Sequence, residues 1–438
     1  MIDAARPDLD GDATGWRDLF SPRAWWCHSV LGLAAAAGGG GALYFIYVER
    51  WSLAFTRAAM QRSPYLPALL VAVGMIVICR VRDRLFPGSE GTGIPQAMAA
   101  LQLGEQPARS RLLSLRIALG KLVLLTLGLF SGATVGREGP SVHFAACCLH
   151  AGRRLAPFPR PLVERGLILA GGAAGIAAAF NAPVAGIVFA FEEIGRSFDK
   201  RNSGAIVGSV AIACLVCIAA LTNYLFYGQV DAQLGGPRTW PVVPAIGIAG
   251  GLLGGCFAQA VASTTPRIAR LARRRPYAVA GSLGLALAVL GGLSGGATYG
   301  GGDAQAHAIL IEGQTLPDSY ALAKAAASFV TLISGIPGGL FAPSLSVGAG
   351  LGQLTAALLP AEMNRQVVVL LAMAAYFSGV VQSPITAAVI IIEMTATRFM
   401  ALPLLIATVL AYAASRLVCP VSLYEALARN FLRRDLVI

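Results

Sequence analysis

The chain has 438 residues, of which 56% are hydrophobic and only 13% are charged. Soluble domains carry about 25% charged residues, so this composition argues against a soluble enzyme of several ordinary domains and indicates an integral membrane protein. The net charge of +12 comes almost entirely from arginines in short clusters between apolar runs. That distribution is typical of cytoplasmic loops and not of a nucleic-acid-binding face.

The first 28 residues lack the apolar core of a signal peptide, and we expect a cytoplasmic or interfacial segment there. Beyond it, apolar runs long enough to cross a bilayer recur along the chain, several of them interrupted by Gly and Pro. They cover residues 30–48, 66–79, 112–135, 167–191, 205–226, 242–262, 278–293, 321–358, 367–392 and 401–418. We read the polar connection that contains His307 and Glu312 as a loop. The sequence therefore predicts an all-α polytopic membrane protein.

Two linked blocks of sequence occur twice. The segments 131–141 and 334–344 share Ser, Gly, Gly, Pro and Ser at a constant offset of 203 residues. Farther along, segments 181–192 and 382–393 match at an offset of 201. This repetition indicates a duplicated membrane domain, with halves at 29–230 and 231–424 and a short tail at 425–438.

The repeated blocks interrupt apolar runs with Gly and Pro, which is the sequence pattern of a transporter binding site. Unwound backbone is tolerated at membrane depth only where protein buries it or where it lines a water-filled cavity. A helix that restarts there presents unpaired N–H groups and the positive end of its dipole. Two such ends that meet near the midplane would hold an anion without a full positive charge.

Three motifs follow one another in a fixed order: Gly91–Pro95 (GTGIP), Gly136–Pro140 (GREGP) and Gly339–Pro343 (GLFAP). With Lys121 before the second motif and Tyr424 near the end, they make almost the whole chain resemble the CLC family of chloride channels and chloride/proton antiporters. The resemblance implies a CLC-type fold of two inverted structural repeats, whose broken helices meet at a central anion site. It also implies a homodimer with two pores.

The resemblance further implies an anion site built from hydroxyl and backbone N–H donors of both halves: Thr92, Gly93, Ile94, Leu340, Phe341 and Tyr424. Thr92 stands where the family usually has Ser, and it keeps an O–H donor. Family members that favour nitrate often have Pro there and a fluoride-selective branch has Met, so Thr92 favours chloride.

Glu138 matches the gating glutamate of the family, which also accepts the proton on the external side. An ionised carboxylate at a helix N-terminus can itself occupy an anion site, and protonation removes that attraction. The alternative is that Glu138 only pairs with Arg137 or caps its helix. Because ionisable residues inside membranes are mostly functional, we expect the gate, with Arg137 as electrostatic support.

In the antiporters of the family a second glutamate accepts the proton on the internal side, and its place falls on Glu193. The adjacent carboxylates of Glu192 and Glu193 could also simply mark the interface with water. Glu192 matches Glu393 in the repeat whereas Glu193 matches Met394, which favours a structural role for Glu192 and a special one for Glu193.

Lys121 is flanked by apolar residues, and two interpretations of it stay open. Its ammonium group could give electrostatic support to the anion by raising the local potential. Alternatively, the long side chain could extend to the membrane surface and place its charge in water.

The joint presence of Glu138 and Glu193 predicts a secondary active antiporter that exchanges chloride for protons across a lipid bilayer. A passive voltage- or pH-gated chloride channel shares every anion-site residue and stays open as an alternative. An intramembrane hydrolase built on Ser141, His143 or the cysteines at 147 and 148 lacks a placed Asp partner, so no enzyme is predicted.

No nucleotide, nucleic acid, metal or other cofactor is expected as a partner. The chain has no phosphate-binding GxxxxGK[ST] motif, and the group His143, Cys147, Cys148 and His150 suits helix packing better than metal ligation. Fourteen residues follow Tyr424, too few for the large C-terminal regulatory module of many family members. We expect the protein to reside in the inner membrane of a bacterium.

Overall fold

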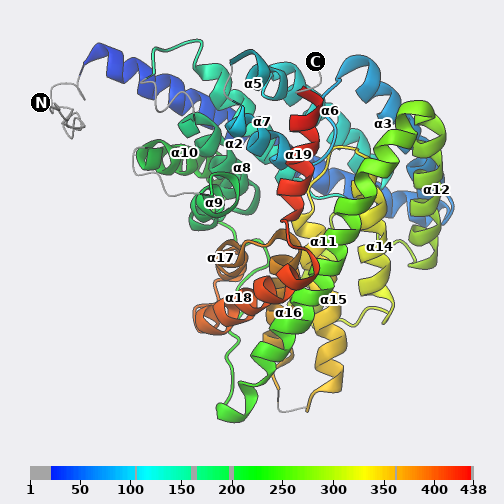
Figure 1. Cartoon of the computed structure of the whole chain (residues 1–438). Coiled ribbons are helices and arrows are strands. Elements are labelled where there is room, and N and C mark those ends of the chain that lie inside the picture. The colour runs from blue at the N-terminus through cyan, green and yellow to red at the C-terminus, as the bar shows by residue number, and fades with distance from the viewer. Residues whose placement is uncertain (1–20, 104–105, 159–164, 197–201, 361–362, 436–438) are drawn as a thin grey trace, which may run out of the picture.

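The computed structural model describes residues 21–103, 106–158, 165–196, 202–360 and 363–435. The described part of the first half is almost entirely helical (Figure 1). Its elements are α2 (Pro22–Arg62), α3 (Leu66–Leu85), α4 (Ile94–Gln102), α5 (Gln106–Leu112), α6 (Leu115–Ser131), α7 (Glu138–Gly152), α8 (Leu167–Phe180), α9 (Pro183–Phe189), the π-helix η2 (Ala190–Ile194) and α10 (Ser203–Leu221).

The second half repeats this order of elements after a short 3₁₀ turn, η4 (Pro237–Thr239). Its helices are α11 (Val242–Arg274), α12 (Pro276–Leu293), α13 (Asp303–Leu310), α14 (Tyr320–Ile333), α15 (Phe341–Leu358), α16 (Arg365–Val381), α17 (Pro384–Thr395), α18 (Ala401–Val418) and α19 (Leu423–Asp435). His307 lies within α13, so the sequence-based expectation of a loop at this residue was wrong. Glu312 follows the end of that helix.

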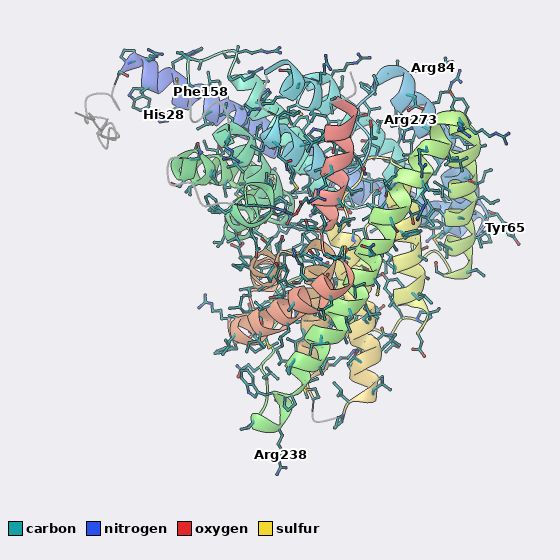
Figure 2. All side chains as sticks on the ribbon, viewed as in Figure 1. His28, Tyr65, Arg84, Phe158, Arg238 and Arg273 are labelled. Carbon is teal, nitrogen blue, oxygen red and sulfur yellow. The ribbon has the colours of Figure 1, made fainter. Side chains whose placement is uncertain are left out.

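The two halves run in opposite directions. The contacting helices α3 and α12 show this clearly on the right of Figure 1. In Figure 2, Tyr65 before α3 lies at the right edge and Arg84 near the end of α3 lies at the top, so α3 runs upward. Helix α12 starts beside Arg273, also at the top, and runs downward. The predicted all-α fold of two inverted repeats is therefore confirmed.

The helix breaks follow from local chemistry that both halves share. Helices α8 and α16 end at Asn181 and Gln382, which adopt left-handed backbone with φ of 53° and 62°. The next helices start with Pro183 and Pro384, which suit the first turn because it needs no N–H donor. Equivalent residues thus end one helix and start the next in each half.

Six helical segments are long and apolar enough to cross a membrane within the described ranges, and the longest is Pro22–Arg62. Helix α2 begins before residue 29 and α19 runs across residue 424, so both outer divisions predicted from the sequence fall inside helices. The exact limits of the two membrane halves, 29–230 and 231–424, stay a prediction. The buried core extends through both halves and surrounds the starts of α4, α7 and α15, where the motifs lie.

Candidate anion and proton site

The two repeated motifs contact each other through their backbones. Gly136 N–H donates to the Gly339 carbonyl at 2.9 Å, and Gly339 N–H donates to the Gly136 carbonyl at 2.6 Å. The two glycines are 203 residues apart, the offset of the repeat, so equivalent atoms exchange bonds as a local two-fold axis requires. Helices α7 and α15 start two residues after these glycines, at Glu138 and Phe341. The duplicated motifs therefore form one structure in which two helix N-termini meet.

Glu138 lies across the start of α15. Its side chain is buried, and its Oε1 accepts a hydrogen bond from Ala342 N–H at 3.2 Å. Its Oε2 has no hydrogen-bond partner among the described residues and lies over two glycines: a Cβ on Gly136 or on Gly339 would come within 2.2 Å or 2.1 Å of it. Glycine at both positions leaves room for this carboxyl group at the helix N-terminus.

The side-chain contacts of Arg137 run to groups other than the Glu138 carboxyl. Its guanidinium forms an ion pair with Glu49 of α2 and donates to the Ala179 carbonyl at 3.1 Å. It also lies 5.3 Å from the centre of the Phe226 ring. The Glu138 side chain accepts a hydrogen bond from Ala342 on α15, so the carboxyl caps the helix of the other half.

The hydroxyl groups of Thr92 and Tyr424 are both buried, and neither oxygen has a protein hydrogen-bond partner in the described part of the chain. The Tyr424 ring lies 6.3 Å from the ring of Phe341, at the start of α15. Thr92 lies beside α7, because a Cβ on Gly139 would come within 2.6 Å of the Thr92 carbonyl oxygen. Two unpaired hydroxyl donors next to these helix starts fit an anion ligand.

Gly93 and Ile94 form the start of α4. Gly93 has φ of 106°, a conformation that favours glycine, and a Cβ there would collide with His143 at 2.5 Å. Ile94 and Leu340 are buried, like the Phe341 ring that packs on Phe377 at 4.7 Å. The structure thus brings all six predicted anion-site residues to the starts of α4, α15 and α19.

Lys121 is fully buried, so its amine does not extend to the membrane surface. Its Nζ donates to the Gly91 carbonyl at 2.5 Å and to the Glu90 carbonyl at 3.3 Å, which fixes the loop before Thr92. Lys324 repeats this arrangement in the second half, with bonds of 3.0 Å to Thr298 and 2.8 Å to Gly300. Lys324 was missed in the sequence, although it follows Lys121 at the repeat offset of 203.

His143 does not approach a metal-binding group. Its Nε2 lies 2.9 Å from the Leu112 carbonyl, within hydrogen-bonding distance. No group of three His, Cys, Asp or Glu side chains that could hold a metal ion occurs within the described ranges.

Glu192 and Glu393 cap each other's repeat. Glu192 accepts from the N–H groups of Ile385 and Thr386, at 3.0 Å and 2.6 Å, at the start of α17. Glu393 accepts from Val184 and Ala185, at 3.1 Å and 2.7 Å, at the start of α9. These bonds give Glu192 a structural role, as the repeat comparison favoured.

Glu193 is buried and makes different contacts from its neighbour. Its Oε2 accepts from the Ser383 hydroxyl at 2.5 Å, and its Oε1 lies 3.9 Å from Arg196. Glu193 thus bonds at the start of α17, whereas Glu138 bonds at the start of α15.

Two cavities lead toward the paired motifs. One, of about 540 Å³, is lined by Arg137 next to the gate candidate, and also by Glu49 and Asp303. The other, of about 1120 Å³, is lined by Thr92 and by Arg270 and is the larger of the two. One cavity therefore borders Arg137, the residue before Glu138, and the other borders Thr92.

Comparison with known proteins gives consistent results. A family model described as voltage gated chloride channel matches residues 73–416. The H(+)/Cl(−) exchange transporter ClcA of Vibrio cholerae is 29% identical over 404 residues, which are 84% of this chain and 79% of that protein. A putative chloride channel protein, ClcB-like, of Ralstonia nicotianae is 31% identical over 361 residues, covering 77% of this chain and 80% of that protein.

Solved structures share the fold. The crystal structure of a slow cyanobacterial Cl⁻/H⁺ antiporter superposes with a TM-score of 0.80 at 22% identity, covering 95% of this chain and 99% of the other. A CLC-type fluoride/proton antiporter gives a TM-score of 0.76, also at 22% identity, over 94% of this chain and 99% of the other.

Proposed function

Because the chain belongs to the voltage-gated chloride channel family and is an integral membrane protein of several spans, we propose that it exchanges chloride for protons across the membrane. The observation that carries the proposal is the position of Glu138 across the start of α15, bonded to Ala342. The Vibrio cholerae relative named as an H(+)/Cl(−) exchange transporter supports the same reaction.

In this mechanism the Glu138 carboxylate competes with chloride for the N–H groups at the start of α15. Protonation removes its charge, so the neutral side chain leaves that site and chloride can enter. Thr92, which lines the larger cavity, and Tyr424 donate hydrogen bonds to the anion through their unpaired hydroxyl groups. Glu193 then exchanges the proton with that side, and the buried position of its carboxyl supports exchange over a passive channel.

The test uses purified protein in liposomes. An imposed chloride gradient is expected to drive protons uphill, and a Glu193→Gln variant is expected to move chloride without protons. Glu312→Gln, which changes an exposed carboxylate, serves as the matched control and is expected to keep full coupling. Absence of uphill proton movement in the unaltered protein, or normal coupling in Glu193→Gln, would contradict the proposal.

A homodimer in the inner membrane of a bacterium forms part of the proposal. Val184 and Ile385 are about half exposed at the starts of α9 and α17, next to the carboxylates that cap these helices. A protein partner covers such mixed polar and apolar surface better than lipid does. Cysteine cross-linking between two copies through residue 385 is expected, and a monomer in membranes would contradict it.

The orientation follows from charge. Arg84 and Arg273 lie at the same upper end of the molecule, and α19 also points there (Figure 2). The positive-inside rule makes this end cytoplasmic, so the larger cavity lined by Arg270 opens to the cytoplasm.

A further inference from the structure

A short segment of the first half, from Glu193 to Arg196, contacts two helices of the second half. The π-helix η2 ends at Ile194, and Arg196 two residues later has φ of 49°. Left-handed backbone is unfavourable for arginine, and it persists where surrounding contacts hold it. Single π-helical turns are frequent at functional sites, and so are residues in unfavourable backbone conformations.

At one end of this segment, the Glu193 carboxyl is fixed through Oε2 by the Ser383 hydroxyl at 2.5 Å, at the start of α17. The Oε1 atom has no hydrogen-bond partner among the described residues and lies 3.9 Å from Arg196 Nη2. Besides Arg196, the charged groups that act on Glu193 are Glu192 and Glu425. Arg196 is therefore the cation that faces this carboxyl among the residues that the structure describes.

At the other end, Arg196 holds the start of α19. Its guanidinium forms an ion pair with Glu425, and its Nη2 donates to the Ser422 hydroxyl at 2.5 Å. These two residues flank Tyr424, whose ring is fully buried near Phe341. One guanidinium group thus lies between the carboxyl of Glu193 and the backbone that positions the Tyr424 hydroxyl.

We propose that Arg196 is a positioning residue that links the charge on Glu193 to the position of Tyr424 at the anion site. The inference rests on the proposed exchange function, in which Glu193 accepts the proton on the internal side. When Glu193 is ionised, it attracts the guanidinium toward α17. When Glu193 is neutral, this attraction is lost and the contacts with Glu425 and Ser422 hold the guanidinium. The start of α19, and with it Tyr424, follows this shift, so proton arrival and anion passage become linked.

The experiment measures protons moved per chloride in liposomes for four variants. Arg196→Gln is expected to lower this ratio by about five-fold or more, the lower range of coupling between sites. The cytoplasmic pH profile of proton transport is expected to shift to higher pH in this variant, because a carboxyl that loses its neighbouring cation holds its proton more tightly. A merely structural role would not move that profile.

Three further variants separate charge from anchoring. Arg196→Lys keeps the charge and is expected to retain most of the coupling. The double variant Arg196→Glu with Glu425→Arg restores an ion pair to α19 but places a carboxylate beside Glu193, so it is expected to fold and to couple poorly. Arg429→Gln removes the other partner of Glu425, at 2.6 Å, and serves as the matched control with normal coupling.

The outcomes distinguish the two proposals. If the unaltered protein moves no protons against a gradient, the proposed function and this inference both fail. If the unaltered protein couples the two ions and Arg196→Gln keeps the same ratio and pH profile, the inference alone is overturned. Should Arg196→Gln fail to fold, normal coupling in the charge-swapped double variant would overturn it as well.

Discussion

Replacing Gly136 with alanine tests whether the Glu138 side chain occupies the start of α15. A Cβ at residue 136 would lie 2.2 Å from Glu138 Oε2 and 2.7 Å from Oε1, and the nearest atoms around it all belong to this side chain. The φ angle of Gly136 is not among the positive ones, so alanine fits the backbone. Gly136→Ala therefore displaces the carboxyl without changing its chemistry.

The magnitude follows from the contacts that are lost. A hydrogen bond to a charged group contributes about 1.5–3 kcal/mol, and a carboxylate at a helix N-terminus gains about 0.3–1 kcal/mol more. Loss of about 2 kcal/mol or more lowers occupancy of the closed position by about 25-fold or more, since about 1.4 kcal/mol corresponds to ten-fold. Chloride flux at neutral pH is therefore expected to rise and to lose most of its dependence on pH.

The assay is chloride efflux from liposomes between about pH 3.5 and 7.5, an interval that spans the ionisation of an ordinary carboxyl, about pH 4.3, and reaches neutral pH. The matched control is Gly292→Ala in α12, where the added Cβ meets no atom of another described element within 4 Å and flux is expected to stay unchanged. If Gly136→Ala shows the flux and pH dependence of the unaltered protein, Glu138 does not rest where the structure has it, and the gating argument is refuted.

Three more predictions concern ion pairs and caps. Glu49→Gln leaves the buried Arg137 guanidinium without its carboxylate, so we expect a loss of about 3–5 kcal/mol in stability, read from thermal unfolding, and an unchanged unfolding temperature would contradict this. Glu393→Gln weakens two bonds to the start of α9, and we expect about 0.5–2 kcal/mol of destabilisation with normal proton coupling, checked by unfolding and by the liposome assay. Burial opposes ionisation of Glu425 on α19. The guanidinium groups of Arg196 and Arg429 outweigh this effect and hold the pKa of the Glu425 carboxyl below its ordinary value. A lowered pKa stabilises the fold above the unfolded value of about 4.3, and this contribution disappears as pH falls through the folded value, so Glu425→Gln should flatten the acid limb of the unfolding curve.

The repeat blocks made much of the fold and site predictable. The helix starts at Glu138 and Phe341 follow from Gly and Pro residues that recur in both repeats at the same offset. The preference of these residues for helix starts is a local property that the sequence alone reveals. The pairing of Glu192 with Glu393 in the repeat likewise indicated their structural role, and their reciprocal capping explains it.

Other features depend on contacts between distant segments, which no local pattern encodes. The partner of Arg137 is Glu49, which lies 88 residues earlier and reaches it only through the packing of α2. Helix α13 follows three consecutive glycines, which are a sequence signal for a loop. This signal led to the prediction of a loop, although the eight residues after the glycines form a helix. Arg196 stands next to Gly195 in a segment that reads as a turn, and its contacts with α19 span 229 residues.

The exchange of hydrogen bonds between Gly136 and Gly339 has a consequence for biosynthesis. Each glycine needs the other, and 203 residues of chain separate them. At about 5–20 residues per second, the ribosome takes about 10–40 s to supply the second partner after the first has been made. During that interval the first half must stay in the membrane with the start of α7 unpaired, and the ion site can form only when both halves are inserted. Two separately expressed halves should therefore regain ion binding only when they are made together.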